Sequence, residues 1–251
     1  MRLVFLISFF IFLMSQFDAQ NLIDAKGLKQ GAWSKVYPGT SVLQYSGQFK
    51  DNVPTGTFTY FYETGKTKAI IVHGDKALRS EAYFYYPSGK LMTFGIYRNQ
   101  KKDSIWSNYN ENQDLVYTET FQNDLLNGNK TTYYLSDATQ GKTNVIASVA
   151  NYLNDKLSGE YTEYFMNGTI KTKGQYKDDV MDGVWLKNNP NGSKMMEERF
   201  KNGKTHGWQY SFDESGKESG KSYYYNGEEL EGKVLDAKLE YFKKNGIDPN
   251  Q

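Results

Sequence analysis

The sequence contains no cysteine, only two histidines and only five prolines among its 251 residues. The missing cysteine excludes disulfide bonds, thiol chemistry and a lipid anchor on an N-terminal cysteine. Lys and Arg number 30 and Asp and Glu 29, so the net charge is +1. This balance provides no basic surface for nucleic acid or anionic lipid. Neither charge nor thiol chemistry therefore selects a partner.

Residues 1–19 have the pattern of a secretory signal peptide. Arg2 provides a positive start, residues 3–14 form an uncharged apolar run, and Ala19 offers a small residue for cleavage. The run is short for a membrane span, although an uncleaved N-terminal anchor is the alternative. We therefore expect an exported protein, periplasmic, outer-surface or secreted, with no transmembrane segment after cleavage.

The rest of the chain repeats itself, in most units every 24 residues. Each unit begins with Gly, or with Ser in its place, at Gly31, Gly56, Ser80, Ser104, Gly128, Gly159, Gly183 and Gly207. In five units a second glycine follows nine residues later, at Gly65, Gly89, Gly168, Gly192 and Gly216. Self-similarity of this kind is typical of arrays in which each unit buries its apolar face against its neighbours.

Each unit contains two aromatic-rich runs separated by turn-forming residues, which predicts a β-hairpin. We expect an all-β fold over residues 20–232: an elongated, twisted antiparallel meander of about eight 24-residue β-hairpin repeats, with about sixteen strands. In residues 233–251 the spacing of Leu235, Leu239 and Phe242 changes to that of a helix. This segment predicts a short C-terminal helix that caps the open end of the sheet.

Several repeated residues are interpreted as structural. Gly56, Gly159 and Gly183 are expected to open hairpins with positive φ, where a side chain would be strained. Trp106 and Trp185, two positions after a unit start, are expected to pack between neighbouring hairpins. Aromatic residues also recur five positions after the start, and positions two and five of an unbroken strand point to opposite faces. Either a bulge re-aims one ring, or both faces carry aromatic rows.

The pattern Gly-x-Tyr/Trp-x-x-Tyr-(Tyr/Phe)-x-x-Gly-Lys, followed by an aromatic residue and Asn-Gly-Lys, resembles the bacterial variant of the MORN repeat. It is similar to the repeats of the YwqK-type antitoxin-like proteins. The resemblance covers about residues 31–232 and is best over 159–216, whereas Gln113 and Asp137 replace the second glycine in the central units. It implies a hairpin-array fold and protein contacts, and it assigns no functional residue.

The sequence offers little for catalysis or metal binding. His73 occupies an aromatic position of the repeat and is interpreted as a packing residue, whereas His206 is interpreted as a solvated turn residue. Residues 178–182 are rich in aspartate but lack the spacing and terminal glutamate of a calcium loop. No nucleophile elbow, phosphate loop or dinucleotide motif is present. We therefore predict no catalytic, cofactor-binding or metal-binding residue and no cofactor.

Consecutive tyrosines suggest a working surface, because neighbours in a strand face opposite sides and some must meet solvent or a partner. The candidate interaction residues are Tyr60, Tyr62, Tyr83, Tyr85, Tyr223 and Tyr225. The function that follows is an exported, non-enzymatic scaffold for protein–protein contacts, with no nucleic-acid partner. The alternatives are a glycan-binding module that uses exposed tyrosine rows, and an immunity or antitoxin-type protein.

The export hypothesis predicts where the mature chain begins. N-terminal sequencing of the protein recovered from cells should start near Gln20, because the small residue Ala19 precedes the expected cleavage site. A chain that keeps Met1 and stays in the inner membrane would instead support the uncleaved anchor.

Overall fold

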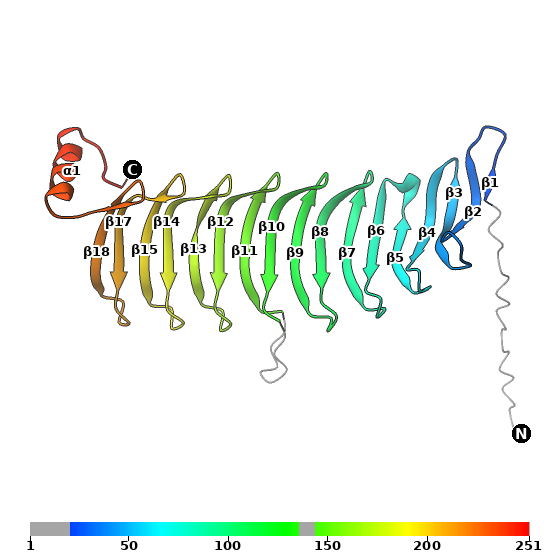
Figure 1. Ribbon diagram of the computed structural model, residues 1–251, viewed down its shortest axis with the longest axis horizontal. Helices are drawn as coiled ribbons and strands as arrows, with labels where there is room; N and C mark the ends of the chain where they lie inside the picture. The colour runs from blue at the N-terminus through cyan, green and yellow to red at the C-terminus, as the bar shows by residue number, and fades with distance from the viewer. Residues whose placement is uncertain (1–20, 136–143, 251) are drawn as a thin grey trace, which may run out of the picture.

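The computed structural model describes residues 21–135 and 144–250, so the expected signal peptide lies outside the described residues. The described chain forms one antiparallel sheet whose strands stand side by side in a single layer (Figure 1). The short helix α1 (Gly232–Lys244) lies at the C-terminal end of this array, and the N-terminal strands lie at the other end.

The sheet formed by the described residues has 19 strands. Each pairs antiparallel with its sequence neighbours, except that β16 and β17 both pair with β15 and not with each other. They are β1 (Leu22–Ile23), β2 (Lys29–Val36), β3 (Leu43–Lys50), β4 (Val53–Phe61), β5 (Thr67–His73), β6 (Arg79–Tyr85), β7 (Leu91–Arg98), β8 (Lys101–Tyr109), β9 (Leu115–Gln122), β10 (Leu125–Tyr133), β11 (Ile146–Leu153), β12 (Lys156–Tyr164), β13 (Ile170–Lys177), β14 (Val180–Asn188), β15 (Lys194–Lys201), β16 (Lys204–Thr205), β17 (Gly207–Phe212), β18 (Glu218–Tyr225) and β19 (Glu228–Leu230). The predicted all-β hairpin meander is confirmed. The strands exceed the predicted sixteen because β1 and β19 are added at the ends and His206 separates β16 from β17.

Along one edge of the sheet, two-residue turns connect most repeats to the next, whereas a short 3-10 helix (Asp75–Ala77) lies between β5 and β6. Both turn residues have positive φ at Asp51–Asn52, Asn99–Gln100, Asn123–Asp124, Asn154–Asp155, Asp178–Asp179, Asn202–Gly203 and Asn226–Gly227. Two positive φ angles in a two-residue loop define the type I′ turn, which matches the twist of the flanking strands. The Asp179 carboxylate accepts a 2.8 Å hydrogen bond from the backbone N–H of Leu157 in the preceding turn region. The acidic segment 178–182 therefore contains a structural turn, as the sequence indicated.

The other edge carries the loops inside each repeat, and here the second glycine provides the positive φ. Gly65 has a φ of 79°, and its N–H donates to the carbonyl of Tyr62 at 2.9 Å. The N–H of Tyr62 donates in turn to the carbonyl of Lys66 at 2.8 Å and closes a three-residue loop. Gln113 takes the same place in the fourth unit with a φ of 68°, so the loop survives without glycine.

The glycines that start the units lie inside strands and do not open hairpins. Gly56 and Gly183 have φ of 63° and 70°, and each lies where the register of its strand shifts. Residues 56–58 of β4 oppose the single residue Gly47 of β3, which is a β-bulge. Gly159, with a φ of 109°, lies in a similar bulge opposite Asn151. A bulge rather than a turn is thus what requires the positive φ.

The bulge seats an aromatic ring on a glycine of the preceding strand. Trp185 lies over Gly174 and Trp106 over Gly95, so closely that a Cβ on either glycine would overlap the ring. The Trp185 indole N–H donates to the backbone carbonyl of Gln175 at 3.2 Å. Both tryptophans are 2% exposed, and each meets a tyrosine edge-to-face with ring centroids 5.0 Å apart. These rings bind each repeat to the next.

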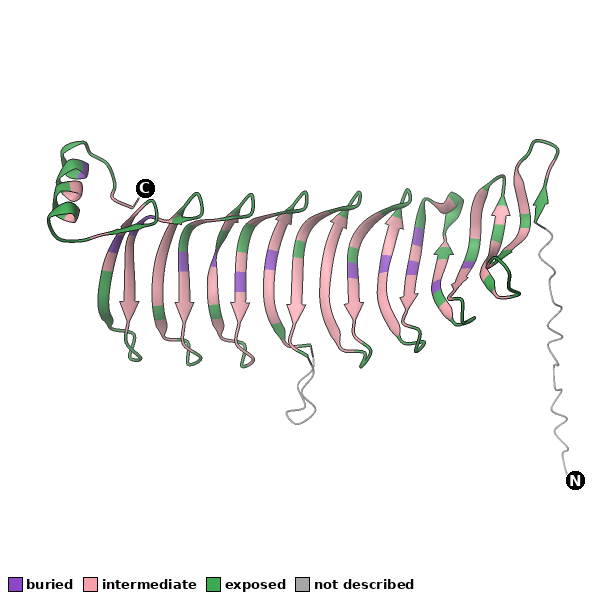
Figure 2. Ribbon diagram, in the orientation of Figure 1, coloured by how far each residue is buried: buried purple, intermediate pink, exposed green. Residues whose placement is uncertain are grey.

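Buried residues are few and lie in a narrow band across the strands (Figure 2). Among the described residues the buried apolar side chains are Phe58, Ala69, Ala82, Trp106, Ala150, Trp185, Tyr223 and Phe242. Most other strand residues are half-buried, because no second layer formed by the described residues covers the sheet. The core is therefore one row of contacts between neighbouring strands, and stability passes from repeat to repeat.

In the last unit the aromatic residue moves by one position and meets the C-terminal helix. Trp208 follows Gly207 directly and pairs with Tyr223, whereas Trp185 lies two positions after Gly183. A shift of one residue reverses the face of a strand, so Trp208 and Tyr223 lie on the opposite face from Trp185. The ring of Tyr223 lies 6.5 Å from that of Phe242 in α1. The predicted capping helix is confirmed.

The seat beneath Trp185 makes Gly174 intolerant of even a methyl group. We expect Gly174→Ala to lower the free energy of unfolding by about 1–3 kcal/mol, since the added Cβ must displace the indole ring. Urea denaturation followed by circular dichroism measures this loss. Gly220→Ala is the matched control, because no atom lies within 4 Å of a Cβ built there. Equal effects at the two glycines would contradict the seating of the ring.

Candidate binding groove

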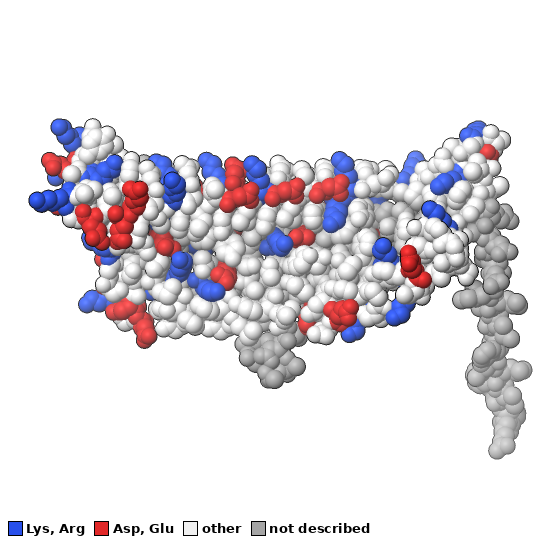
Figure 3. Space-filling view, viewed as in Figure 1, with Lys and Arg blue, Asp and Glu red and all other residues white. Residues whose placement is uncertain are grey.

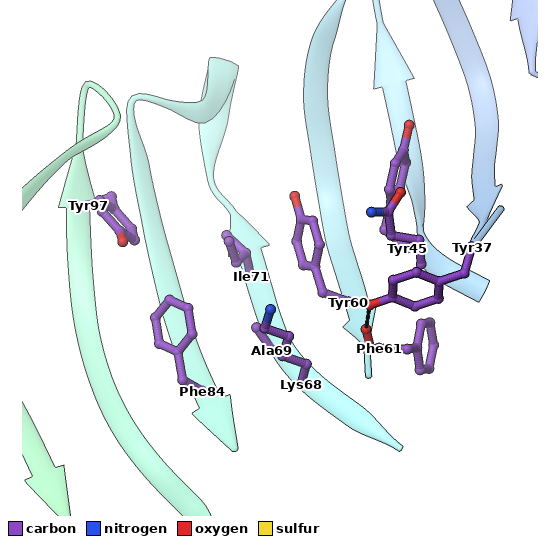
Figure 4. A pocket seen from close by; sticks show the side chains of 10 residues that line it. Tyr37, Tyr45, Tyr60, Phe61, Lys68, Ala69, Ile71, Phe84 and Tyr97 are labelled. Carbon is purple, nitrogen blue, oxygen red and sulfur yellow. Dashed lines mark hydrogen bonds between the residues drawn. The ribbon is translucent and has the colours of Figure 1, made fainter. Parts of the chain in front are cut away.

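The third repeat lacks the aromatic residue at position two, and a hollow lies there. Ala82 occupies that position and pairs with Ile71, where Gly47 and Gly95 serve as seats in the neighbouring repeats. The strands β5 and β6 pair without a register shift, so the bulge is missing as well. The face around Ala82 consequently carries a hollow of about 500 Å³ (Figure 4).

Aromatic side chains form the walls of this groove, and small apolar side chains form its floor. Ala69 and Ile71 lie on the floor, with Tyr60 to one side and Phe84 and Tyr97 to the other (Figure 4). Ala69 is 4% exposed and the neighbouring Ala82 is fully buried. The walls are half-buried, so their rings present surface to any molecule that enters.

Tyr45 extends the tyrosine wall toward the N-terminus. Its ring centroid lies 6.0 Å from that of Tyr60, at an angle of 42°. Burial raises the pKa of Tyr60, and Tyr45 adds to the shift, so the Tyr60 phenol stays protonated at neutral pH. Protonated phenols keep a donor hydrogen and an uncharged ring, which suits contact with an uncharged ligand.

Charge lies at the margin of the groove rather than inside it. The exposed Lys68 contributes the cation at its rim, with Nζ 5.8 Å from the ring centroid of Tyr62. On the face of the whole molecule drawn in Figure 3, charged side chains form a row along the upper edge, and much of the middle is uncharged. Recognition at the groove would therefore depend on shape and apolar contact, with Lys68 available to a polar or anionic group at the rim.

A second, smaller hollow adjoins the first and shares Ile71 and Tyr97 with it. It contains His73, whose Nδ1 lies 2.9 Å from Oγ of Ser80. Burial lowers the pKa of His73, and its ring packs edge-to-face on Phe58 with centroids 5.3 Å apart, as its aromatic position indicated. Ser80 is 4% exposed, and no carboxylate is hydrogen-bonded to His73 in the described chain. The pair lacks the third group that orients a catalytic histidine.

The predicted tyrosines do not form one surface. Tyr60 lies in the groove, whereas Tyr83 follows Ala82 by one residue, points to the other face and stacks on Phe94. Tyr62 donates its hydroxyl hydrogen to the backbone carbonyl of Tyr85 at 2.7 Å, which ties the second unit to the third.

Tyr223 and Tyr225 lie under the C-terminal helix. Tyr223 is 1% exposed and donates to the carbonyl of Pro249 at 2.8 Å. The ammonium of Lys238 lies 3.6 Å from the ring centroid of Tyr225. Both rings contact the cap; Tyr223 is not available as a free surface, whereas Tyr225 stays half-buried.

A ladder of tyrosine hydroxyl groups was missed by sequence reasoning. The residue six positions after the start donates to the carbonyl at position five of the next unit in four places: Tyr37 to Phe61, Tyr62 to Tyr85, Tyr86 to Tyr109 and Tyr134 to Tyr164. The signal is the recurrence of tyrosine at position six. The groove residues Tyr45 and Tyr97 were missed too, and the signal for them is Ala82 breaking the aromatic pattern.

His206 is not the solvated turn residue that the sequence suggested. It is 4% exposed, lies between β16 and β17, and its Nδ1 lies 3.1 Å from Oδ1 of Asn226. Its ring lies 5.0 Å from that of Tyr225. The correction has a physical reason: the strand bulges at this point and turns the side chain toward the last hairpin.

Within residues 21–135 and 144–250, no cluster of His, Asp or Glu is arranged to hold a metal ion. No helix in the same residues is long and apolar enough to span a membrane.

Comparison with known proteins adds little to this picture. No family model matches the sequence, and no curated protein matches it. Among solved structures the chain is similar to a porin-like protein from Bacteroides uniformis, with 11% identity over 79% of this chain and 92% of that one, at a TM-score of 0.19. A TM-score this low supports no inference about fold or function.

The buried phenol of Tyr60 predicts a pH dependence of stability. Its pKa is raised in the folded state, so the unfolded chain ionises first, near pH 10, and the free energy of unfolding falls as pH rises beyond that value. Urea titrations at pH 8 and pH 11 should show a larger loss for the wild type than for Tyr60→Phe. An equal loss would mean that the Tyr60 hydroxyl is as solvated in the folded chain as in the unfolded one.

Proposed function

We propose that this chain is an exported, non-enzymatic repeat protein whose sheet serves as a scaffold for protein–protein contacts in the cell envelope or outside the cell. The observation that carries the proposal is the aromatic groove over Ala69 and Ile71, on a sheet face that no other helix or strand of residues 21–135 and 144–250 covers. Half-exposed tyrosine and phenylalanine are enriched at protein interfaces, since they bury large rigid areas at a low entropic cost.

The resemblance to bacterial MORN-variant repeats supports the same class of function. An immunity or antitoxin-type role is an alternative to the scaffold function. The balanced charge is consistent with a partner recognised by shape and apolar contact rather than by a field of one sign.

Glycan binding is the second candidate, and the pair Tyr45 and Tyr60 favours it. Their neighbouring half-buried rings offer a platform on which a sugar ring could stack. The two candidates differ in what the purified protein retains: a stable protein partner, or an insoluble polysaccharide.

Affinity purification from envelope fractions, with mass-spectrometric identification and reconstitution from purified components, tests the proposal. Tyr60→Ser should weaken binding of the reconstituted partner by about 1–3 kcal/mol, which is the range of an interface hot spot. Tyr83→Ser, on the other face, is the matched control and should bind normally. Retention on polysaccharide alone, or normal binding by folded Tyr60→Ser, would contradict the scaffold reading of this groove.

A further inference from the structure

One row of side chains crosses the sheet. Where two repeats meet, the row contains a pair of residues, here called a rung: the seat on one strand and the residue at position two of the next repeat. The two members of a rung are matched in size. Where the seat is glycine, the residue above it is a large ring, as with Gly95 and Trp106. Where the seat carries a methyl group, as at Ala150, the partner is the smaller ring of Tyr161. In the centre of the row Glu119 and Lys130 replace ring and seat with an ion pair of 2.9 Å. Each of these rungs is filled from within the chain.

The rung between β5 and β6 differs from these. Ile71 and Ala82 meet there, and neither reaches as far above the sheet as a tryptophan ring would. The aromatic surroundings are nevertheless kept. Phe84 and Tyr97, which border the empty side, also flank Trp106 in the next rung, with centroids 6.3 and 5.0 Å from its ring. The groove thus has walls that already pack an indole ring on their other side.

We propose that this groove is a socket for one aromatic side chain, tryptophan or tyrosine, presented by a protein partner. The inference rests on the proposed protein-binding function and names the group that the groove recognises. The hollow of about 500 Å³ falls within the range of ligand sites and leaves room for a ring and its flanking backbone. A ring seated on Ala69 and Ile71 would meet Tyr60 and Phe84 in the tilted or edge-to-face arrangements that aromatic pairs prefer.

The chemistry of the lining favours an aromatic side chain over a sugar. A sugar needs hydrogen-bond partners for its ring hydroxyl groups, and the floor of alanine and isoleucine provides none. The hydroxyl of Tyr37 is already bound to the carbonyl of Phe61 at 2.6 Å. The other polar groups of the lining are the Gln44 amide, the Lys68 ammonium and the hydroxyls of the remaining tyrosines, which the backbone of a peptide partner would meet beside its ring.

Filling the socket from within tests the proposal. The double variant Ile71→Gly/Ala82→Trp rebuilds the glycine and tryptophan of the neighbouring rungs, and Ala69→Trp places a ring on the floor by a single change. Val72→Trp is the matched control: it adds the same side chain to the same strand, on the opposite face, where Val72 is 39% exposed. Circular dichroism melts establish which variants are folded.

The probe is N-acetyl-5-fluoro-L-tryptophanamide, followed by fluorine NMR in titrations with the full-length protein. We expect binding to the wild type and to Val72→Trp, and at least tenfold weaker binding to each folded filled variant. The proposal is overturned if the probe does not bind the wild type, if the filled variants bind it equally, or if cellopentaose occupies the groove in preference to it.

The partner captured from envelope fractions separates this inference from the proposed function. Equal binding of that partner by wild type and filled variants would overturn the socket and leave the scaffold function standing. Conversely, the probe could bind the wild type and not the filled variants while no protein partner is recovered from envelope fractions. That result would count against the scaffold function and not against the socket. Loss of the captured partner in the filled variants, but not in Val72→Trp, would support both.

Discussion

The contact on which the structure depends is an aromatic ring seated on the bare backbone of a glycine in the preceding strand. A single-layer sheet has no second layer against which to bury side chains, so its stabilising contacts must run along the sheet. Trp185 on Gly174 and Trp106 on Gly95 solve this by lying flat across the strand boundary. Each seated ring removes a large apolar area from water, and its tyrosine neighbour adds the edge-to-face attraction of an aromatic pair.

The bulge, the start glycine and the seat glycine act together to place the aromatic ring on the preceding strand. The ring reaches the preceding strand only because extra residues at the bulge re-aim it, and the bulge needs positive φ at Gly56 or Gly183. At one edge of the sheet, tyrosine hydroxyl groups bond to the next repeat, as Tyr86 does to the carbonyl of Tyr109. At the other edge, turn carboxylates link neighbouring repeats, as Asp179 does by accepting from the N–H of Leu157. Every linkage joins a repeat to the next, as in other repeat arrays.

The candidate groove arises from a local departure from this arrangement. Where Ala82 replaces the ring and Ile71 replaces the seat, the register stays regular and the aromatic walls enclose an open hollow. The ends of the array depart from it differently. Trp208 lies one position earlier in its unit than the other tryptophans and therefore faces the other side of the sheet. It pairs with Tyr223, whose ring contacts Phe242 of the C-terminal helix. A repeat array thus acquires a site, or an end, wherever one unit breaks the common pattern.

The sequence alone determined the hairpin array, its period, its two kinds of turn and its helical cap, because these follow from local chemistry: glycine and asparagine in turns, aromatic residues in strands, and helical spacing after Gly232. It left open whether positions two and five share a face, and it misplaced Gly56 and His206. Those points depend on the register between strands, since a shift of one residue reverses the side that every later residue faces. The groove was missed too, because Tyr45, Ala69 and Tyr97 belong to different repeats and meet only across paired strands. Tertiary structure therefore decided which aromatic residues became core, cap or open surface, because burial depends on neighbours that only strand pairing supplies.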